Sequence, residues 1–409
     1  MGPGGGMKRK GAVLTSPLRG EVAAERRVRG SGAVMGKGPT DGPSPLTPSL
    51  SPEGRGGDAV RGVVSRPLKT VADLEAARLV SADAGLDAVA EKYAIGITPA
   101  VFDLIDVDDP ADPMARQFVP STEELLTTPE EREDPIGDLS HSPVEGIVHR
   151  YPDRVLLKAV HVCPVYCRFC FRREMVGPQG LGTLTAAELD AAMDYIAAHE
   201  EIWEVILTGG DPLVLSPRRL AALMERLRRI EHVKIVRFHT RVPVVEPERI
   251  DREMVAALTA SGKTTYLAVH ANHPREFSEA AKRAFRLLFD GGVVLVSQSV
   301  LLRGVNDDVE TLAALMRGFV ENRIKPYYLH HPDLAPGTSH FRIGIEEGQK
   351  LVAALRGKIS GLCQPTYVLD IPGGHGKADI GEAAVTGGDG CFTVRDWQGG
   401  DHAYPPGES

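Results

Sequence analysis

The stretch that decides the fold and the chemistry of this chain is Cys163-Pro-Val-Tyr-Cys167-Arg-Phe-Cys170-Phe-Arg-Arg173. The chain has only five cysteines in 409 residues, and three of them fall within this stretch. Thiolates bind soft metals, and iron–sulfur clusters are usually held by four of them. Three cysteines would leave one iron of a cubane cluster without a protein ligand. The spacing therefore predicts a [4Fe–4S] cluster that is bound by Cys163, Cys167 and Cys170 and has one open iron.

An open iron can bind a small molecule, and S-adenosylmethionine (SAM) is the usual one for this cysteine spacing. The cluster then supplies the electron that cleaves the sulfonium and yields a carbon radical, while the protein positions and shields the cofactors. Two other interpretations of the cysteines remain open. A structural zinc site could take His161 as its fourth ligand. A redox Cys-x2-Cys pair formed by Cys167 and Cys170 would leave Cys163 without a role.

The composition is that of a soluble globular protein, with 42% hydrophobic and 25% charged residues. The net charge of −8 makes nucleic acid an unexpected partner. No run reaches the ~18 apolar residues that a membrane helix needs, and the N-terminus lacks the apolar region of a secretory signal. Few cysteines, mostly in one motif, argue against a disulfide framework. We therefore expect a reducing, cytoplasmic compartment and no membrane partner.

The first third of the chain divides into two parts. The start is rich in Gly, Pro, Ser and Arg and has no apolar period, which predicts disorder. Apolar residues recur at helical spacing from Thr70 to Lys92, and the segment from Pro120 to Ser142 is acidic and interrupted by proline. We expect this second part to wrap over a scaffold formed later. The predicted divisions are a disordered tail (1–68), a helical and extended wrap (69–148), a barrel (149–345) and a C-terminal segment with a short tail (346–409).

Strand-like runs alternate with helical patterns through the middle of the chain: Val155–Val160, Glu204–Thr208, Lys234–Phe238, Thr265–Val269, Val293–Ser297 and Lys325–Leu329. Thr185-Ala-Ala-Glu188 is a capping box that starts one of the helices. Such alternation predicts parallel βα units in an α/β fold. They could close a full barrel, form an open doubly wound sheet or make a partial barrel. Because six units are short of eight, we predict a partial (β/α)6 TIM-like barrel. A seventh strand, Thr366–Leu369, could extend its edge.

In such folds the active site lies at the C-terminal ends of the strands. The second predicted strand is followed by Gly209-Gly210-Asp211, and adjacent glycines permit close backbone approach to a ligand. The same residues also make an ordinary turn. His270 and Gln298 follow the fourth and fifth strands. Together these polar strand ends predict one shaped cavity, and candidate SAM contacts are Gly209, Gly210, Asp211, His270 and Gln298.

The last motif is Asp370-Ile-Pro-Gly-Gly-His-Gly-Lys377. A lysine on a glycine-rich loop is often a solvated surface charge. It can also reach into a cavity and form a Schiff base with pyridoxal 5′-phosphate (PLP). PLP would need cationic phosphate contacts, and Arg150 and Arg154 are candidates because a guanidinium matches phosphate geometry. The residues alone leave both interpretations of Lys377 open.

This ordered series of motifs resembles the lysine 2,3-aminomutase family of radical SAM enzymes. The resemblance runs from Ile97 to Asp379. It is carried by Ile147–Arg154, Cys163–Arg173, Leu207–Pro212, Thr240–Val245, His270–Pro274, Gln298–Asp307, Pro326–His330, Gly337–Arg342 and Pro372–Lys377. It implies an isomerase that uses a SAM-derived 5′-deoxyadenosyl radical and PLP, as an aldimine, to move an amino group between C2 and C3 of an amino acid. It also implies an electron donor such as flavodoxin or ferredoxin, and it is compatible with a homo-oligomer.

The resemblance also assigns roles to single residues. Lys377 falls on the position that holds PLP as an aldimine, and Arg150 and Arg154 on its phosphate contacts. Arg172 falls on the position that pairs with the substrate carboxylate. The two acidic positions that receive the distal ammonium of lysine are Asp333 and Asp370. Family members that act on glutamate should need a cation or an amide at those two positions, so two aspartates favour L-lysine, with β-lysine as the product.

The chain departs from the family pattern in several places. The long lysine-degrading enzymes bind zinc through C-terminal cysteines, whereas only Cys363 and Cys391 lie near this end, so we expect no such zinc. His330 is tyrosine in those enzymes and His331 replaces a further polar residue, so the pocket beside Asp333 could differ. Alternatives are the same migration on ornithine, arginine or glutamate, β-lysine supply for elongation factor P modification, a radical SAM enzyme without PLP, and a non-catalytic iron–sulfur or zinc module.

Overall fold

The computed structural model describes residues 64–176, 182–388 and 391–405. The predicted disordered tail lies outside the described residues, apart from its last few positions. Within those positions, Leu68 is buried and pairs with Ile97 in an isolated bridge. Leu68 is therefore part of the folded chain.

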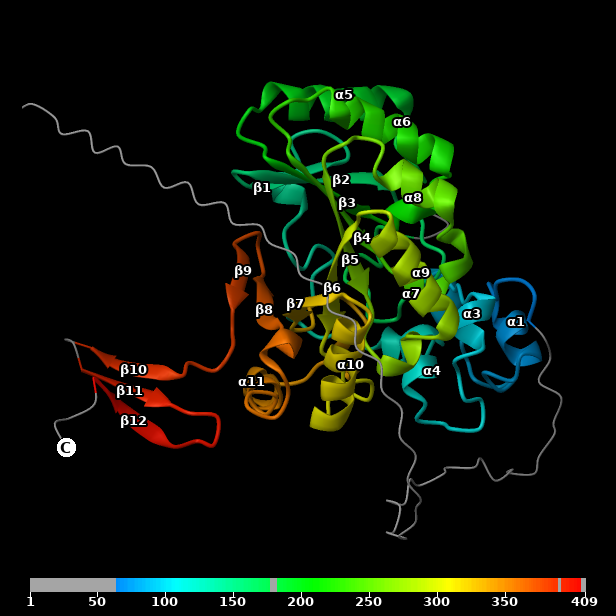
Figure 1. Cartoon of the computed structure of the whole chain (residues 1–409). Helices are drawn as coiled ribbons and strands as arrows, with labels where there is room; N and C mark the ends of the chain where they lie inside the picture. The colour runs from blue at the N-terminus through cyan, green and yellow to red at the C-terminus, as the bar shows by residue number, and fades with distance from the viewer. Residues whose placement is uncertain (1–63, 177–181, 389–390, 406–409) are drawn as a thin grey trace, which may run out of the picture. The chain divides into compact units, whose positions relative to one another are not determined.

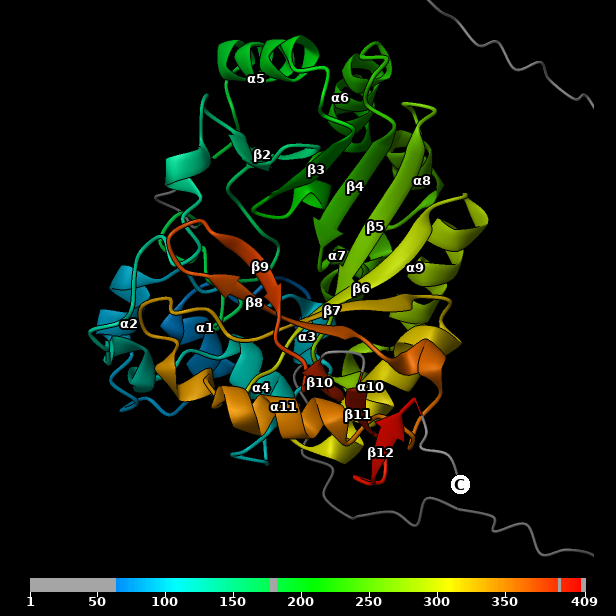
Figure 2. The ribbon, with the colours of Figure 1, turned by 90° about the vertical axis from the view of Figure 1, so that its left-hand side faces the viewer.

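A single nine-stranded sheet forms the body of the protein, and its strands follow one another in chain order (Figure 2). Strands β2 to β8 run parallel, whereas β1 and β9 are antiparallel to their neighbours. Among the described residues β1 does not pair with β9, so the barrel is open. The strands are β1 (Ile147–Tyr151), β2 (Arg154–Val160), β3 (Glu204–Gly209), β4 (Ile235–Thr240), β5 (Thr264–His270), β6 (Val294–Val300), β7 (Lys325–His330), β8 (Thr366–Ile371) and β9 (Gly376–Asp379).

The predicted partial barrel is thus confirmed, with seven parallel strands because β8 joins the six that were expected. Strand β3 shows why these runs form the centre of the sheet. Its residues Val205, Ile206 and Leu207 are all buried, as expected for a parallel strand that is covered on both faces.

Helices cover the outer face of the strands (Figure 1). They are α5 (Ala186–Ala198), α6 (Pro217–Arg228), α8 (Arg252–Leu258), α9 (Glu279–Asp290), α10 (Val309–Glu321) and α11 (Ile345–Ala353). The capping box predicted at Thr185 is confirmed, because its side chain accepts from the Glu188 amide and the Glu188 side chain accepts from the Thr185 amide. No helix in the described ranges is long and apolar enough to cross a membrane.

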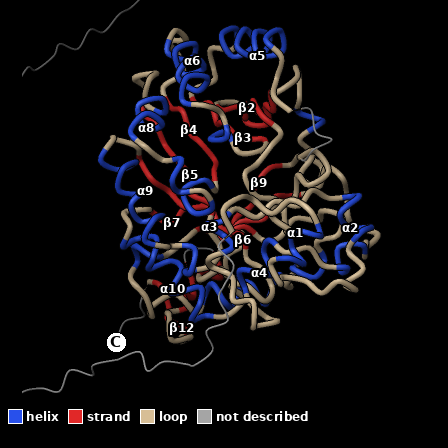
Figure 3. Tube along the Cα trace, turned by 90° about the vertical axis from the view of Figure 1, so that its right-hand side faces the viewer, coloured by secondary structure: helices blue, strands red, loops and turns tan. Residues whose placement is uncertain are grey.

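The wrap consists of short helices at one end of the sheet (Figure 3). These are α1 (Val71–Ala76), α2 (Asp87–Lys92), α3 (Pro99–Phe102) and α4 (Pro113–Phe118), followed by the 3-10 turns η1 (Thr122–Leu125) and η2 (Leu139–His141). The prediction of one helix from Thr70 to Lys92 was wrong in its middle. Arg78 and Gly85 adopt φ values of 61° and 65°, and a left-handed residue cannot continue a right-handed helix.

The C-terminal segment also holds more structure than the short tail that was expected. Strands β10 (Val385–Gly388), β11 (Cys391–Arg395) and β12 (Asp401–Tyr404) form a separate antiparallel sheet. Nearly all of its residues are exposed. The alternation of buried and exposed residues that reveals a strand in a sequence is therefore missing here.

The wrap forms hydrogen bonds with the loops that follow strands β4 and β6 of the barrel. Thr98 donates to the Val245 carbonyl after β4, and Arg116 Nε donates to the Arg303 carbonyl after β6 at 2.9 Å. Gln117 accepts from Arg241 after β4 at 3.1 Å. The wrap therefore covers the C-terminal ends of the strands, where the cavity was predicted.

Residues 120–142 form the part of the wrap that we call the acidic strap. It carries three buried carboxylates, each paired with arginine from elsewhere in the chain. The pairs are Glu124 with Arg168 and Arg173, Glu131 with Arg342, and Asp138 with Arg150 and Arg172. Charges that leave water need such partners, so the strap is fixed mainly by ion pairs.

Replacing Glu124 by alanine should lower the free energy of unfolding by about 3–5 kcal/mol, because Arg168 and Arg173 would stay buried without their counter-charge. Glu279→Ala is the control, since Glu279 and its partner Lys282 lie exposed on α9 and should contribute little. Urea unfolding followed by circular dichroism measures both variants. A Glu124→Ala variant as stable as the parent would show that the strap does not depend on this carboxylate.

Candidate active site

One cavity of about 240 Å³ collects side chains from the whole nine-stranded sheet. Every strand contributes at least one lining residue. In chain order they include Arg150, Leu156, Thr208, His239, His270, Gln298, His330, Asp370 and Lys377. The loops after β2 and β7 add Cys167, Cys170, Arg172 and Asp333. The cavity predicted at the strand ends is therefore present.

The three cysteines of the first motif lie together on the loop after β2. Cys163, Cys167 and Cys170 border one small cavity of about 50 Å³. Cys167 and Cys170 also border the cavity of about 240 Å³ described above, which we call the main cavity. Burial raises the pKa of all three thiols, that of Cys170 to about 11. Thiols in such a place ionise when a cationic metal group binds them. A cluster bound by these residues would stand at the border of the main cavity, so the site fits it.

The zinc alternative finds no support in this geometry. Within residues 64–176, 182–388 and 391–405, no three His, Cys, Asp or Glu side chains are placed to share one metal ion. His161 is buried next to the loop, and its amide donates to the Gly182 carbonyl at 2.7 Å. A cubane cluster differs from zinc, because each thiolate binds a different iron and the ligands need not meet at one point.

The wrap fixes the cysteine loop through backbone and arginine contacts. The amide of Tyr166 donates to the Gly96 carbonyl at 3.1 Å, and the amide of Arg168 donates to the Gln117 carbonyl at 2.9 Å. A Cβ atom on Gly96 would lie 2.8 Å from the Tyr166 ring, so only glycine allows this approach. Arg173 donates to the Gly337 carbonyl at 3.0 Å as well as to Glu124.

The Gly209-Gly210-Asp211 turn lies behind the cavity wall. The Gly210 amide donates to the Val160 carbonyl at 2.7 Å, and a Cβ atom on Gly210 would lie 2.3 Å from the Val162 carbonyl oxygen. Asp211 accepts from the Thr240 hydroxyl at 2.7 Å and from the Arg241 amide at 2.8 Å. In this structure the three residues hold the end of β3 against the entry of the cysteine loop. Their contact with SAM stays a prediction.

His270 and Gln298 line the cavity, as their places at strand ends suggested. His270 Nε2 and Gln298 Oε1 are buried without a hydrogen-bond partner, and so are the Nε2 atoms of His239 and His330. Burial lowers the pKa of His270 to about 3, so its ring is neutral. Unpaired buried polar atoms are costly, so this wall fits a polar ligand such as SAM. The sequence analysis missed His239, although it alternates with buried Phe238 along β4.

Lys377 and Asp370 face each other across the antiparallel pair β8–β9. Lys377 Nζ donates to both Asp370 oxygens at 2.6 and 2.8 Å, and His330 Nδ1 lies 3.3 Å from Asp370 Oδ2. Burial alone would raise the pKa of Asp370, but the hydrogen bond from His330 and the charge of Lys377 hold it well below its usual range. Asp370 is therefore ionised.

Asp333 lines the same cavity and behaves in the opposite way. Burial and the negative charge of Asp370 raise its pKa to about 8. The two carboxyl groups together therefore carry one proton and one negative charge at neutral pH, as expected for like charges that share a site.

Arg150 and Arg172 share one carboxylate, that of Asp138. Arg150 Nη2 donates to Asp138 Oδ1 at 3.0 Å, and Arg172 Nη2 donates to Asp138 Oδ2 at 2.9 Å. Arg154 lies at the cavity too, but it is more exposed, pairs with Asp153 at 2.6 Å and stacks over the Tyr151 ring. The sequence analysis missed Asp138, because nothing distinguishes it from the other acids of the strap.

The acidic strap also rests on the loop that precedes Lys377. His141 Nε2 lies 3.0 Å from the Gly374 carbonyl oxygen. Gly137 has a φ of 70°, and a Cβ atom there would lie 2.4 Å from the Gly374 nitrogen. The amide of Lys377 donates to the Tyr151 hydroxyl at 2.8 Å. The acidic strap, β1 and the loop that precedes Lys377 therefore pack together beside the cavity.

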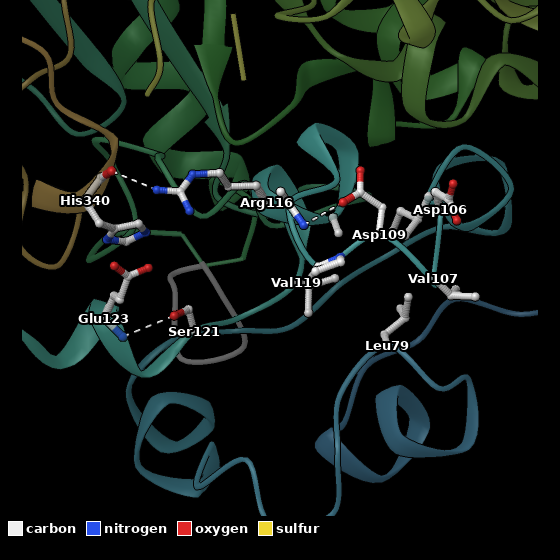
Figure 4. Close-up of a pocket in the computed structure, with 13 residues that line it drawn as sticks. Leu79, Asp106, Val107, Asp109, Arg116, Val119, Ser121, Glu123 and His340 are labelled. Carbon is white, nitrogen blue, oxygen red and sulfur yellow. Dashed lines mark hydrogen bonds between the residues drawn. The ribbon is translucent and has the colours of Figure 1, made fainter. Parts of the chain in front are cut away.

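Another cavity of about 300 Å³ lies in the wrap near α4 (Figure 4). Arg116 there donates to the His340 carbonyl at 3.0 Å, and Ser121 accepts from the Glu123 amide at 3.2 Å. None of the residues predicted from the sequence lines it. We assign the chemistry to the main cavity, where the cysteines and the titratable groups meet.

Comparison with known proteins agrees with this geometry. Residues 157–316 match the model of the Radical SAM superfamily. The L-lysine 2,3-aminomutase of Acetoanaerobium sticklandii is 43% identical over 286 residues, which cover 70% of this chain and 69% of that protein. The chain belongs to the lysine 2,3-aminomutase family. Other members are the L-lysine 2,3-aminomutase of Escherichia coli, 35% identical over 70% of this chain and 83% of that protein, and the Glutamate 2,3-aminomutase of Clostridioides difficile, 35% identical over 76% and 73%.

Membership in the aminomutase family makes this protein an isomerase whose small-molecule substrate is an amino acid. The cofactors that the family implies are a [4Fe–4S] cluster, SAM and PLP. The cavity fits PLP as well as the cluster, since it presents a lysine amine together with Arg150 and Arg154. The family resemblance that the motifs carried is therefore confirmed.

Gly137→Ala should weaken PLP binding by about tenfold or more, because overpacking against the lysine loop costs on the order of 1–3 kcal/mol. The matched control is Gly85→Ala, since Gly85 has a similar φ of 65° but no atom within 4 Å of the added Cβ. The visible absorbance of retained PLP, titrated against PLP concentration, gives both affinities. An equal loss in the two variants would assign the effect to backbone strain alone.

Proposed function

We propose that this protein is an L-lysine 2,3-aminomutase, which moves the α-amino group of L-lysine to C3 and yields β-lysine. The observation that carries the proposal is the placement of Asp333 and Asp370 in the same cavity as Arg172 and Lys377. A lysine substrate brings one carboxylate and one remote ammonium. One arginine and a pair of carboxyl groups complement it in charge.

In this proposal each cofactor is bound by its own set of residues. Lys377 holds PLP covalently, and Arg150 and Arg154 bind its phosphate, for which a guanidinium fork is well matched. When bound, PLP makes the migrating nitrogen able to bridge two carbons, and the SAM-derived radical starts and ends the reaction. Cys163, Cys167 and Cys170 bind the cluster, and His270 and Gln298 contact SAM. Gly209, Gly210 and Asp211, at the end of β3, would contact SAM as well.

Asp370 has two uses in this scheme. In the structure its carboxylate neutralises the Lys377 ammonium. A lysine that is committed to a cofactor cannot neutralise Asp370 at the same time. The carboxylate then becomes available for the distal ammonium of the substrate, with His330 and Arg150 still beside it.

Glutamate is the less favourable substrate, although one relative is named Glutamate 2,3-aminomutase. Its side-chain carboxylate would meet Asp333 and Asp370, and like charges at close range are repulsive in a buried site. The electron for SAM cleavage would come from a low-potential donor such as flavodoxin or ferredoxin, in a cytoplasmic setting.

The reaction is tested directly on anaerobic protein with SAM, PLP, dithionite and L-lysine, with mass spectrometry of derivatised products. We expect β-lysine from the parent and none from Lys377→Ala, because the variant keeps its cluster but cannot hold PLP covalently. Iron and sulfide content confirms that the cluster is intact in both. Release of deoxyadenosine without β-lysine would contradict lysine as the substrate and would direct the search to ornithine, arginine and glutamate.

The KM for L-lysine should fall as pH rises through the pKa of Asp333, which is about 8 beside the Lys377 ammonium and higher once Lys377 is committed to PLP. Below this pH the carboxyl group must lose its proton before it can pair with an ammonium, which costs up to about tenfold in affinity per pH unit. Asp333→Asn removes the titrating group and should flatten this part of the profile. An unchanged profile in that variant would show that Asp333 does not meet the substrate.

A further inference from the structure

The buried guanidinium of Arg241 lies directly against a predicted cluster ligand. Arg241 follows β4, and its Nη1 donates to Cys167 Sγ at 3.2 Å. The residue is only 7% exposed, and it lines the main cavity beside Cys167 and Cys170. The sequence analysis included it only within the motif Thr240–Val245 and gave it no role.

The position of Arg241 does not depend on the cysteine. Its Nη2 donates to Glu276 and to Gln117 Oε1, the latter at 3.1 Å. The guanidinium carbon also lies 4.9 Å from the centre of the Phe118 ring and 5.4 Å from that of Phe169. A cation that is held from several sides stays in place when the group bound to Cys167 changes its charge.

Glu276, the main partner of Arg241, is fixed in turn. It accepts from the amides of Asn272 at 2.7 Å and of His273 at 3.0 Å, and it is fully buried. Its charge is therefore satisfied by backbone donors as well as by the arginine. One arm of the guanidinium remains directed at the sulfur.

We propose that Arg241 raises the reduction potential of the cluster through its hydrogen bond to Cys167. When the cluster takes up one electron from an external donor, no bond forms or breaks, and the added negative charge spreads onto the thiolate sulfurs. A fixed cation and an N–H donor at one sulfur stabilise this reduced state more than the oxidised state. Arg241 thus acts on electron entry and needs no contact with the amino acid. The proposal rests on the cluster assignment within the proposed function.

A purely structural role for Arg241 is the alternative, because it also joins the wrap to the barrel through Gln117. Arg275 offers a matched comparison. Arg275 lies in the loop after β5 and, like Arg241, joins the barrel to the wrap, through Asp112 and the Leu104 carbonyl. Among the described residues it forms no bond with a cysteine.

The test is a potentiometric titration of reconstituted protein, followed by electron paramagnetic resonance of the reduced cluster. Arg241→Gln should have a more negative midpoint potential. At the potential where the parent is half reduced, its ratio of reduced to oxidised cluster should fall by about tenfold, a shift of about 59 mV for one electron. Arg241→Lys, which keeps the charge but loses the rigid fork, should shift less in the same direction. Arg275→Gln should keep the potential of the parent.

An unchanged midpoint in Arg241→Gln with the iron and sulfide content of the parent would overturn the proposal, as would an equal shift in Arg275→Gln. If Arg241→Gln takes up no cluster, the midpoint potential of Arg241→Lys decides, and an unchanged value would overturn the proposal. These outcomes are independent of β-lysine formation. A parent protein that shows a redox-active cluster but makes no β-lysine would contradict the proposed substrate and leave the role of Arg241 to the titration.

Discussion

The cavity depends on one buried carboxylate, that of Asp138, which lies between two arginines. Three charges leave water together here, and they can do so because each arginine pairs with the same anion. The group keeps an excess positive charge at the cavity wall, since Lys158 lies near it as well. That excess is what an anionic ligand needs, so two anions of different kinds, a phosphate and a carboxylate, can be received at neighbouring places. A missing Asp138 would leave Arg150 and Arg172 to repel each other.

The same strap joins parts of the site that are far apart in the sequence. Glu124 holds two arginines of the cysteine loop, Asp138 holds the anion-binding arginines, and Gly137 touches the loop that carries Lys377. Each contact is made by a different residue of one short acidic segment. The positions of the cysteine loop, of Lys377 and of Arg172 are thereby set by a single element. This explains why a segment with almost no regular secondary structure, and with many exposed residues, still carries three buried carboxylates.

The sequence predicted the strands, the cavity and its main residues, because buried parallel strands are apolar and polar residues at their ends gather at one edge. It could not identify Glu124 or Asp138, since an acid finds its arginine only through tertiary contact. Gly209 and Gly210 were interpreted as ligand contacts, which stays a prediction, and the sequence did not reveal that they also allow close packing of two backbones. Strands β10 to β12 were missed because their exposed residues show no alternating pattern. Sequence patterns therefore reveal residues that face a core or a ligand better than residues that hold others in place.

The charge balance of the cavity argues for the kind of molecule that it binds. Asp370 is ionised and Asp333 is protonated near neutral pH, so this pair of carboxyl groups carries one negative charge. Lys377 neutralises that charge in the structure. If Lys377 serves the cofactor, Asp370 has a place for one more cation, while Arg150 and Arg172 can receive anions; Arg150 Nη1 lies 3.9 Å from Asp370 Oδ1, so the two places adjoin. A diamino acid complements both the arginines and the carboxyl pair, whereas a dicarboxylic acid would complement the arginines and bring a like charge to the carboxyl pair.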